Sequence, residues 1–169
     1  KVSDILKIME SYKSDYIDNA IIPELDTKFK RNLFNTFRSY IDLNNHFPFH
    51  YKLNSDERGT FVETMKLNTG GQVSYSTTIP GITRGNHFHT RKIERFAVIK
   101  GEATIKMRKI NTKEIFEFKL NGSEPSFVDM PIWYTHNITN TEQSELITMF
   151  WINEFYDEKD ADTFFEKVE

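Results

Sequence analysis

The hydrophobic pattern of residues 1–45 is helical. Between Ser3 and Tyr16, a capping serine precedes apolar residues at the spacing of a short amphipathic helix. From roughly Glu24 to Ile41, apolar residues recur every four positions, with Lys and Arg interleaved on the other face. These residues are Leu25, Phe29, Leu33, Phe37 and Ile41. The stripe predicts a second helix whose apolar face is buried, either against this domain or, equally, against another subunit or a further domain.

After Phe47 the pattern changes to short runs rich in Val, Ile, Thr, Phe and Tyr, separated by Asn, Gly and Pro about every ten residues. The predicted strands are Gly59 to Lys66, Gln72 to Thr78, Asn86 to His89, Glu94 to Ile99, Ala103 to Lys109, Glu114 to Lys119, Ser126 to Asp129, Thr135 to Asn140 and Glu145 to Ile152. Short antiparallel strands in this number close most readily as a double-sheet jelly-roll barrel. The tail, Asp157 to Glu169, predicts one short terminal helix. We therefore expect an all-β domain over residues 46–169.

Composition narrows the class of partner. The chain has 169 residues, 38% of them hydrophobic, which is enough for one substantial core. The net charge of −3 comes from scattered residues, which disfavours nucleic acid and anionic membranes as partners. No apolar run approaches the ~18 residues of a membrane span, and the N-terminus does not resemble a secretory signal. We expect a cytoplasmic protein that acts on a small molecule, and the initial Lys1 suggests excision from a longer chain.

The absence of cysteine means that any metal must be held by histidine and carboxylate. His87 and His89 lie two residues apart in a predicted strand, so they share a face, and Glu94 begins the next strand. With His136 they form an open nitrogen and oxygen site suited to Zn, Fe, Mn, Ni or Co. A metal that only stabilises the fold is the structural alternative, although structural zinc usually has thiolate ligands.

The other two histidines, His46 and His50, are expected to be ordinary surface or hydrogen-bonded residues.

The two segments that contain the candidate ligands resemble the paired motifs of the cupin family. The stretch from Gly81 to Gly101 reads G-x5-H-x-H-x4-E-x6-G and matches the first cupin motif at every fixed position. The stretch from Pro131 to Asn140 resembles the second motif, P-x-G-x2-H-x3-N, with Trp in place of its glycine. Cupins place these motifs on facing strands, so the resemblance implies that the histidine of the second motif completes the site.

The segment from Asp56 to Glu63 spells D-x-R-G-x-F-x-E, which resembles the dTDP-4-dehydrorhamnose 3,5-epimerases. These cupins invert carbon centres beside the ketone of a nucleotide sugar. The resemblance implies that Arg58, Phe61 and Glu63 contact the nucleotide. An arginine fork suits a pyrophosphate and an aromatic face suits a base, although the residues alone fit a solvated turn equally well.

The segment Arg84 to His87 resembles the R-G-x-H segment of the same epimerases, in which the histidine is the catalytic base. We expect Arg84 to bind substrate. Those epimerases lack a metal and carry Gln where this chain has His89. A metal-bound histidine cannot also collect a proton, so the role of base is not assigned to His87.

Nearly the whole chain resembles the C-terminal half of the CapF-type capsular polysaccharide enzymes. These are bifunctional proteins with an N-terminal nucleotide-dependent reductase domain and a C-terminal zinc cupin, and they make the precursor of UDP-N-acetyl-L-fucosamine. The resemblance implies zinc-dependent C3 epimerisation of a UDP-4-keto-2-acetamido-2,6-dideoxyhexose, with no NAD(P) in this domain and C4 reduction by the reductase domain. It also implies a domain-linking or interface role for residues 1–45, and we expect a homodimer.

Epimerisation requires a base and an acid on opposite faces of the sugar, or one flexible group that does both. Tyr134, on the same strand face as His136, is the first candidate, and Lys92, in the turn before Glu94, is the second. Two other functions stay open. An iron cupin dioxygenase would use the same ligands and consume oxygen, and a non-catalytic sugar-binding or assembly module would keep the metal without proton exchange.

Overall fold

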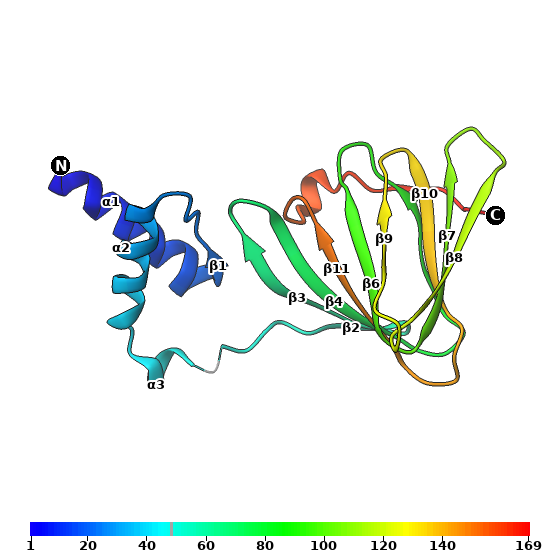
Figure 1. Cartoon of the computed structure of the whole chain (residues 1–169), viewed down its shortest axis with the longest axis horizontal. Helices are drawn as coiled ribbons and strands as arrows, with labels where there is room; N and C mark the ends of the chain where they lie inside the picture. Colours follow the sequence, from blue (N-terminus) through cyan, green and yellow to red (C-terminus); the bar gives the residue numbers. More distant parts are fainter. Residues whose placement is uncertain (48) are drawn as a thin grey trace.

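The N-terminal pattern folds as two main helices in the computed structural model, which describes residues 1–47 and 49–169 (Figure 1). The first, α1 (Val2–Tyr12), continues into a π-helix (Lys13–Asp18). The second, α2 (Lys28–Ser39), begins after the N-cap Thr27, and α3 (Leu43–His46) is one further turn. Both predicted helices are confirmed, and α2 is shorter at each end than its hydrophobic stripe.

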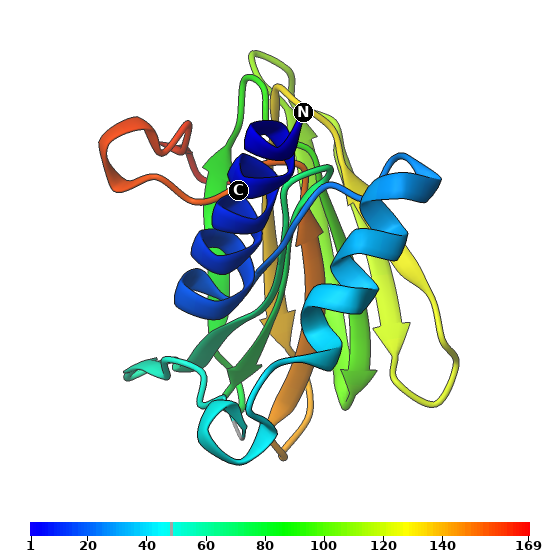
Figure 2. The ribbon, with the colours of Figure 1, turned by 90° about the vertical axis from the view of Figure 1, so that its left-hand side faces the viewer.

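The helices α1 and α2 pack against each other through aromatic side chains, and Figure 2 shows both of them in front of the strands. Tyr12 and Phe34 are buried, with ring centroids 5.1 Å apart. Of the predicted stripe, Phe37 is half-buried and Phe29 is 55% exposed. The two helices leave an apolar groove of about 780 Å³ between them and α3. The stripe is therefore buried in part against α1, and the rest of it faces this groove.

All nine predicted strands are confirmed, with ends shifted by up to three residues. They are β3 (Gly59–Leu67), β4 (Gly71–Thr78), β5 (Thr83–Phe88), β6 (Glu94–Lys100), β7 (Glu102–Lys109), β8 (Ile115–Asn121), β9 (Phe127–Met130), β10 (Tyr134–Asn140) and β11 (Leu146–Ile152). Three very short strands were not predicted: β1 (Ile21–Ile22), β2 (Asn54–Asp56) and β12 (Phe164–Phe165). None of the described helices is long and apolar enough to cross a membrane.

The strands form two sheets that enclose the core. One sheet has the order β1-β3-β4-β11-β6-β9, with β2 also paired to β3, and the other has the order β12-β5-β10-β7-β8. The pairing of β1 with β3 is parallel and attaches the helical segment to the first sheet. In the part of the chain that the structure describes, no strand of one sheet pairs with a strand of the other. The two sheets therefore do not close into the expected barrel.

The C-terminal tail does not form the predicted helix over Asp157 to Glu169. Only a short 3-10 turn forms at Glu158–Asp160. Beyond it, β12 pairs with β5, and Val168 is buried. Asp162 has a left-handed backbone with φ of 43°, which is incompatible with a continuous helix. Pairing with β5 and contacts outside the tail replace the hydrogen bonds that a helix would have supplied.

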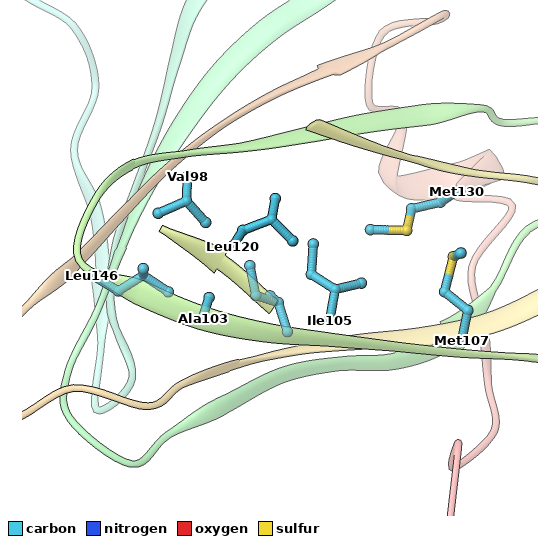
Figure 3. Packing of buried hydrophobic residues seen from close by; sticks show 8 residues of the cluster. Val98, Ala103, Ile105, Met107, Leu120, Met130 and Leu146 are labelled. Atoms are coloured by element: carbon cyan, nitrogen blue, oxygen red, sulfur yellow. The ribbon is translucent and has the colours of Figure 1, made fainter. Parts of the chain in front are cut away.

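A cluster of alternating apolar residues fills the space between the sheets (Figure 3). The cluster comprises Val98, Ala103, Ile105, Met107, Leu120, Met130, Ile138 and Leu146. Successive side chains of a strand point to opposite faces, so in β7 every second residue, Ala103, Ile105 and Met107, points into this cluster. Met107 and Met130 meet at one end of the cluster in Figure 3. Since Met107 is paired in register with His136, the hydrophobic core directly adjoins the histidines described below.

Candidate metal centre

The structure brings together the four side chains predicted as metal ligands. His87 lies near the end of β5 and is paired directly with His136 of β10. His89 follows β5, and Glu94 is the first residue of β6. One nitrogen or oxygen from each of the four side chains lies within 4.8 Å of those from the others. Two strands of one sheet and one strand of the facing sheet therefore converge on a single point.

Two glycines of the sequence motifs are required by close backbone approaches. Gly85 has φ of +100°, and a Cβ there would lie 2.7 Å from the carbonyl oxygen of His136. Gly59, in the D-x-R-G segment, has φ of +133°, and a Cβ there would lie 2.3 Å from the carbonyl oxygen of Thr77. Only glycine tolerates both the positive φ and the contact. Gly85 thus allows β5 and β10 to approach where they carry ligands.

Three buried atoms of the cluster have no hydrogen-bond partner: His89 Nε2, Glu94 Oε2 and His136 Nε2. The two nitrogens lie 3.3 Å and 3.1 Å from Glu94 Oε2, close enough for an ion pair but without the alignment of a hydrogen bond. Buried polar atoms are normally paired, so such a group calls for an explanation. Nitrogen and oxygen donors that converge without bonding to one another fit a divalent cation.

Backbone carbonyls hold the other ring nitrogen of two of these histidines. His89 Nδ1 lies 2.6 Å from the carbonyl oxygen of Asp162, and His136 Nδ1 lies 3.1 Å from that of Tyr134. A carbonyl can only accept, so each Nδ1 carries a proton, and Nε2 is the nitrogen left to face the other members of the cluster. Such outer hydrogen bonds are usual for metal-binding histidines, because they fix the tautomer and the ring orientation.

The electrostatics favour the protonation state that a metal needs at His87 and at Glu94, whereas at His89 they favour the protonated form. Burial lowers the pKa of His87 to about 4, and the neighbouring His136 adds to this effect. Burial also acts to lower the pKa of His89, but Glu94 outweighs it and raises that pKa overall. For Glu94, burial acts to raise the pKa, and the imidazoles of His136 and His89 lower it well below its usual range. At neutral pH the site therefore presents a neutral His87 and an ionised Glu94.

A cavity of about 740 Å³ joins this cluster to the D-x-R-G-x-F-x-E segment. Its lining includes three predicted ligands, His87, His89 and Glu94, and all predicted substrate contacts, Arg58, Phe61, Glu63 and Arg84. His136 is buried behind the lining and 3% exposed. Residues from separate predicted motifs thus share one solvent-accessible space, as expected for a small-molecule site.

The two arginines of the cavity are held in fixed orientations. Arg58 Nε donates to Asp56 Oδ2 at 3.0 Å, and its Nη2 forms an ion pair with the same carboxylate. This contact lowers the pKa of Asp56 to about 2. Arg84 Nη2 donates to the carbonyl of Thr77 at 3.0 Å. Both guanidinium groups are anchored on one side, which leaves their remaining donors for an anionic ligand.

The structure separates the two candidates for proton transfer. Lys92 is 3% exposed and lines the cavity. Its Nζ donates to the carbonyl of Ala161 at 2.6 Å and lies 5.6 Å from the ring centroid of Tyr156. Tyr134 packs against the hydrophobic cluster and is not among the residues that line the cavity. Of the two, only Lys92 is brought to the wall of the cavity.

Asp162 is the residue that the sequence did not reveal. It lies in the tail that was expected to be helical, yet its carbonyl oxygen contacts His89. No motif spacing points to it.

His46 contacts the rings of Tyr16 and Phe47, and His50 is exposed, in agreement with the ordinary roles expected of both.

Comparison with known proteins places the chain in a family. The family model described as polysaccharide biosynthesis C-terminal domain matches residues 54–164. A UDP-2-acetamido-2,6-beta-L-arabino-hexul-4-ose reductase of Pseudomonas aeruginosa is 40% identical over 134 residues, which are 79% of this chain and 36% of the relative. The capsular polysaccharide assembling protein CapF of Staphylococcus aureus superposes with a TM-score of 0.87 and 37% identity, over 98% of this chain and 44% of that chain.

The chain therefore spans less than half of the length of these relatives. The cupin domain of Drosophila melanogaster CENP-C superposes with a TM-score of 0.51 and 10% identity, over 61% of this chain and 75% of that chain, which shows a shared cupin-like fold alone. The family match covers most of the β part, and the superposition on CapF extends through the N-terminal helices as well. This chain belongs to the polysaccharide biosynthesis C-terminal domain family, as a C-terminal domain of the CapF type.

Proposed function

We propose that this chain is a metal-dependent epimerase in the synthesis of a capsular polysaccharide precursor. Its substrate is a UDP-4-keto-2-acetamido-2,6-dideoxyhexose, and it inverts C3 on the route to UDP-N-acetyl-L-fucosamine. The observation that carries the proposal is the single cavity that joins the His/Glu cluster to the anchored arginines. The reductase named for Pseudomonas aeruginosa acts on a UDP-hexul-4-ose, which supports the same class of substrate here.

The metal would be held by His87, His89, Glu94 and His136. Zinc is the proposed ion, and Fe, Mn, Ni and Co suit the same donors. A bound divalent ion supplies a Lewis acid that stabilises negative charge on a ketone oxygen. CapF has been solved with the inhibitor 3-isopropenyl-tropolone. A tropolone offers two adjacent oxygens, as metal chelators do, which fits a metal-dependent relative.

The nucleotide end of the substrate is assigned to the D-x-R-G-x-F-x-E segment. Arg58 and Arg84 each have free donors that suit the diphosphate. Phe61, whose ring centroid lies 5.6 Å from that of Phe150, presents an aromatic face for the uracil ring. Glu63 is held by Lys66 at 2.7 Å and can accept a hydrogen bond from the nucleoside. With the nucleotide bound in this way, the sugar would lie at the His87 end of the cavity.

Proton transfer at C3 is assigned to Lys92, because its amine reaches the cavity that also contains the metal ligands. The carbonyl of Ala161 accepts from the amine at 2.6 Å, and Glu154 Oε1 lies 3.7 Å from it, so both groups orient the amine. Tyr134 is the alternative acid or base, and it would need to reach the substrate from the core side of His136. Because Lys92 is buried, little water can reach the proton that it would transfer.

The remaining parts of the proposal concern the full-length protein. The relatives are more than twice as long as this chain, and we assign the C4 reduction to a reductase domain outside these residues. Residues 1–45 would then link that domain to the metal-binding domain, 46–169. A cytoplasmic homodimer is the proposed state, because nucleotide sugars are cytoplasmic substrates and the apolar groove of α1 and α2 needs a cover.

The test is deuterium exchange at C3 of the UDP-4-keto sugar in D₂O, followed by NMR. The zinc-loaded chain should exchange the hydrogen at C3 for deuterium, and Lys92→Met should remove this exchange while the zinc content is unchanged. Lys109→Met, at an exposed position on β7, is the matched control. If Tyr134→Phe removes the exchange and Lys92→Met does not, the proton belongs to Tyr134. A zinc-loaded wild type without exchange would refute the epimerase, and oxygen uptake by an iron-loaded chain would favour the dioxygenase.

A further inference from the structure

A single carboxylate holds the turn between His89 and Glu94 from outside the cavity. Asp162 accepts hydrogen bonds from the amide of Thr90 at 3.1 Å, of Arg91 at 2.9 Å and of Lys92 at 3.0 Å. The hydroxyl of Thr90 donates to the same carboxylate at 2.6 Å. Consecutive amides that converge on one anion fix the backbone of a turn more tightly than a single bond does.

The backbone beside this carboxylate reaches the two functional side chains of the turn. The carbonyl of Asp162 accepts from His89 Nδ1 at 2.6 Å, and the carbonyl of Ala161 accepts from Lys92 Nζ at 2.6 Å. Asp162 has a left-handed backbone with φ of 43°, and both its carbonyl and its carboxylate contact the same turn. Asp and Asn are the residues that tolerate this conformation best after glycine.

The tail is attached to the sheet independently of Asp162. β12 pairs with β5, and Arg108 donates to the carbonyl of Val168 at 2.9 Å and to Glu166 Oε1 at 2.8 Å. Val168 is 1% exposed. The contacts of Asp162 are therefore not needed to keep the tail in place. They concentrate on the turn that carries His89 and Lys92.

We infer that Asp162 is a positioning residue for the metal centre, acting through the tautomer of His89 and the placement of Lys92. The inference rests on the proposed metal site. It predicts that metal affinity and proton transfer both depend on a residue that contacts neither the metal nor the sugar. Replacement of such outer partners typically weakens metal binding about 10- to 100-fold.

The test compares Asp162→Asn with Asp160→Asn in the full chain. Asp160 is an exposed neighbour whose carboxylate pairs with the side chain of Arg91, so its variant removes a charge and leaves the bonds of the three amides to Asp162 in place. Zinc affinity is measured by competition with a chromogenic chelator, and the ligand geometry by the visible absorption of the cobalt-loaded chain. Asp162→Asn keeps the backbone carbonyl on His89 but loses the anion that holds the three amides, so it should bind zinc about 10-fold more weakly and shift the cobalt bands, while Asp160→Asn should match the wild type.

Equal zinc affinity and equal cobalt spectra in the two variants would overturn the inference. If Asp162→Asn does not fold, Thr90→Ala replaces it, because it removes only the hydroxyl bond to Asp162 and should weaken zinc binding by a smaller factor. A wild type that binds zinc but does not exchange C3 would refute the proposed function and leave the role of Asp162 supported by the affinities. A wild type that binds no zinc would overturn both.

Discussion

Removal of the metal should destabilise the chain by an amount set by the unpaired atoms of the cluster. His89 Nε2, Glu94 Oε2 and His136 Nε2 are buried without partners, and each such group costs about 1–3 kcal/mol. An ion that satisfies all three should raise the free energy of unfolding by about 3–9 kcal/mol. A stabilisation of about 3 kcal/mol is what free zinc supplies at ~100 times its Kd. For a chain of this size, that stabilisation corresponds to a rise in Tm of about 6–12 °C.

The assay is thermal unfolding of chelator-stripped protein with and without added zinc. His136→Ala and Glu94→Gln should lose most of the zinc-dependent rise in Tm, because each removes one converging donor. His50→Ala, at an exposed position outside the cluster, should keep it. A rise below ~2 °C in the wild type, or a full rise in His136→Ala, would refute the assignment of the unpaired atoms to a metal.

Three further substitutions test other parts of the site and fold. Arg58→Ala should weaken UDP binding about 10- to 100-fold, since a charged hydrogen bond contributes ~1.5–3 kcal/mol, and calorimetry with Arg95→Ala as control measures it. Gly85→Ala should lower zinc affinity, because its Cβ would lie 2.7 Å from a carbonyl of β10; normal affinity in chelator competition would contradict this. Ile105→Ala should lower the unfolding free energy in urea by about 2–5 kcal/mol, and Ile115→Ala, at a 40% exposed position, by much less.

The strands were predictable because runs rich in β-branched and aromatic residues are separated by Asn, Gly and Pro. In β7 the residues also alternate, since Ala103, Ile105 and Met107 are buried and the residues between them are only half-buried. The convergence of His87, His89, Glu94 and His136 was predictable for a different reason, since their spacing matches a family motif. β1 and β2 were missed because two or three residues are too few to show a period.

The tail was predicted wrongly because its local pattern fits a helix and its actual partners are distant. Phe164 pairs with Phe88 across β12 and β5, and Asp162 bonds to Thr90, more than seventy residues earlier in the chain. A sequence window carries no information about such contacts. The same argument applies to the closure of the barrel, which depends on how the edge strands of two sheets meet. Residues that support a site from another segment are thus the ones that sequence patterns reveal least.

The second cupin motif shows how a departure from a pattern can preserve its geometry. Trp133 replaces the glycine of that motif and still adopts the left-handed backbone, with φ of 64°, at a cost of about 1–2 kcal/mol. Its amide donates to the carbonyl of His89 at 2.8 Å, so the turn before His136 is tied directly to the first motif. Its ring stacks on Phe88, which stacks on Phe164 of the tail. The pair of Trp133 with Phe88 contributes ~0.5–1.5 kcal/mol, which offsets part of the strain. The tryptophan therefore does what the glycine does for the backbone, and it also joins the second motif to the tail that supplies Asp162.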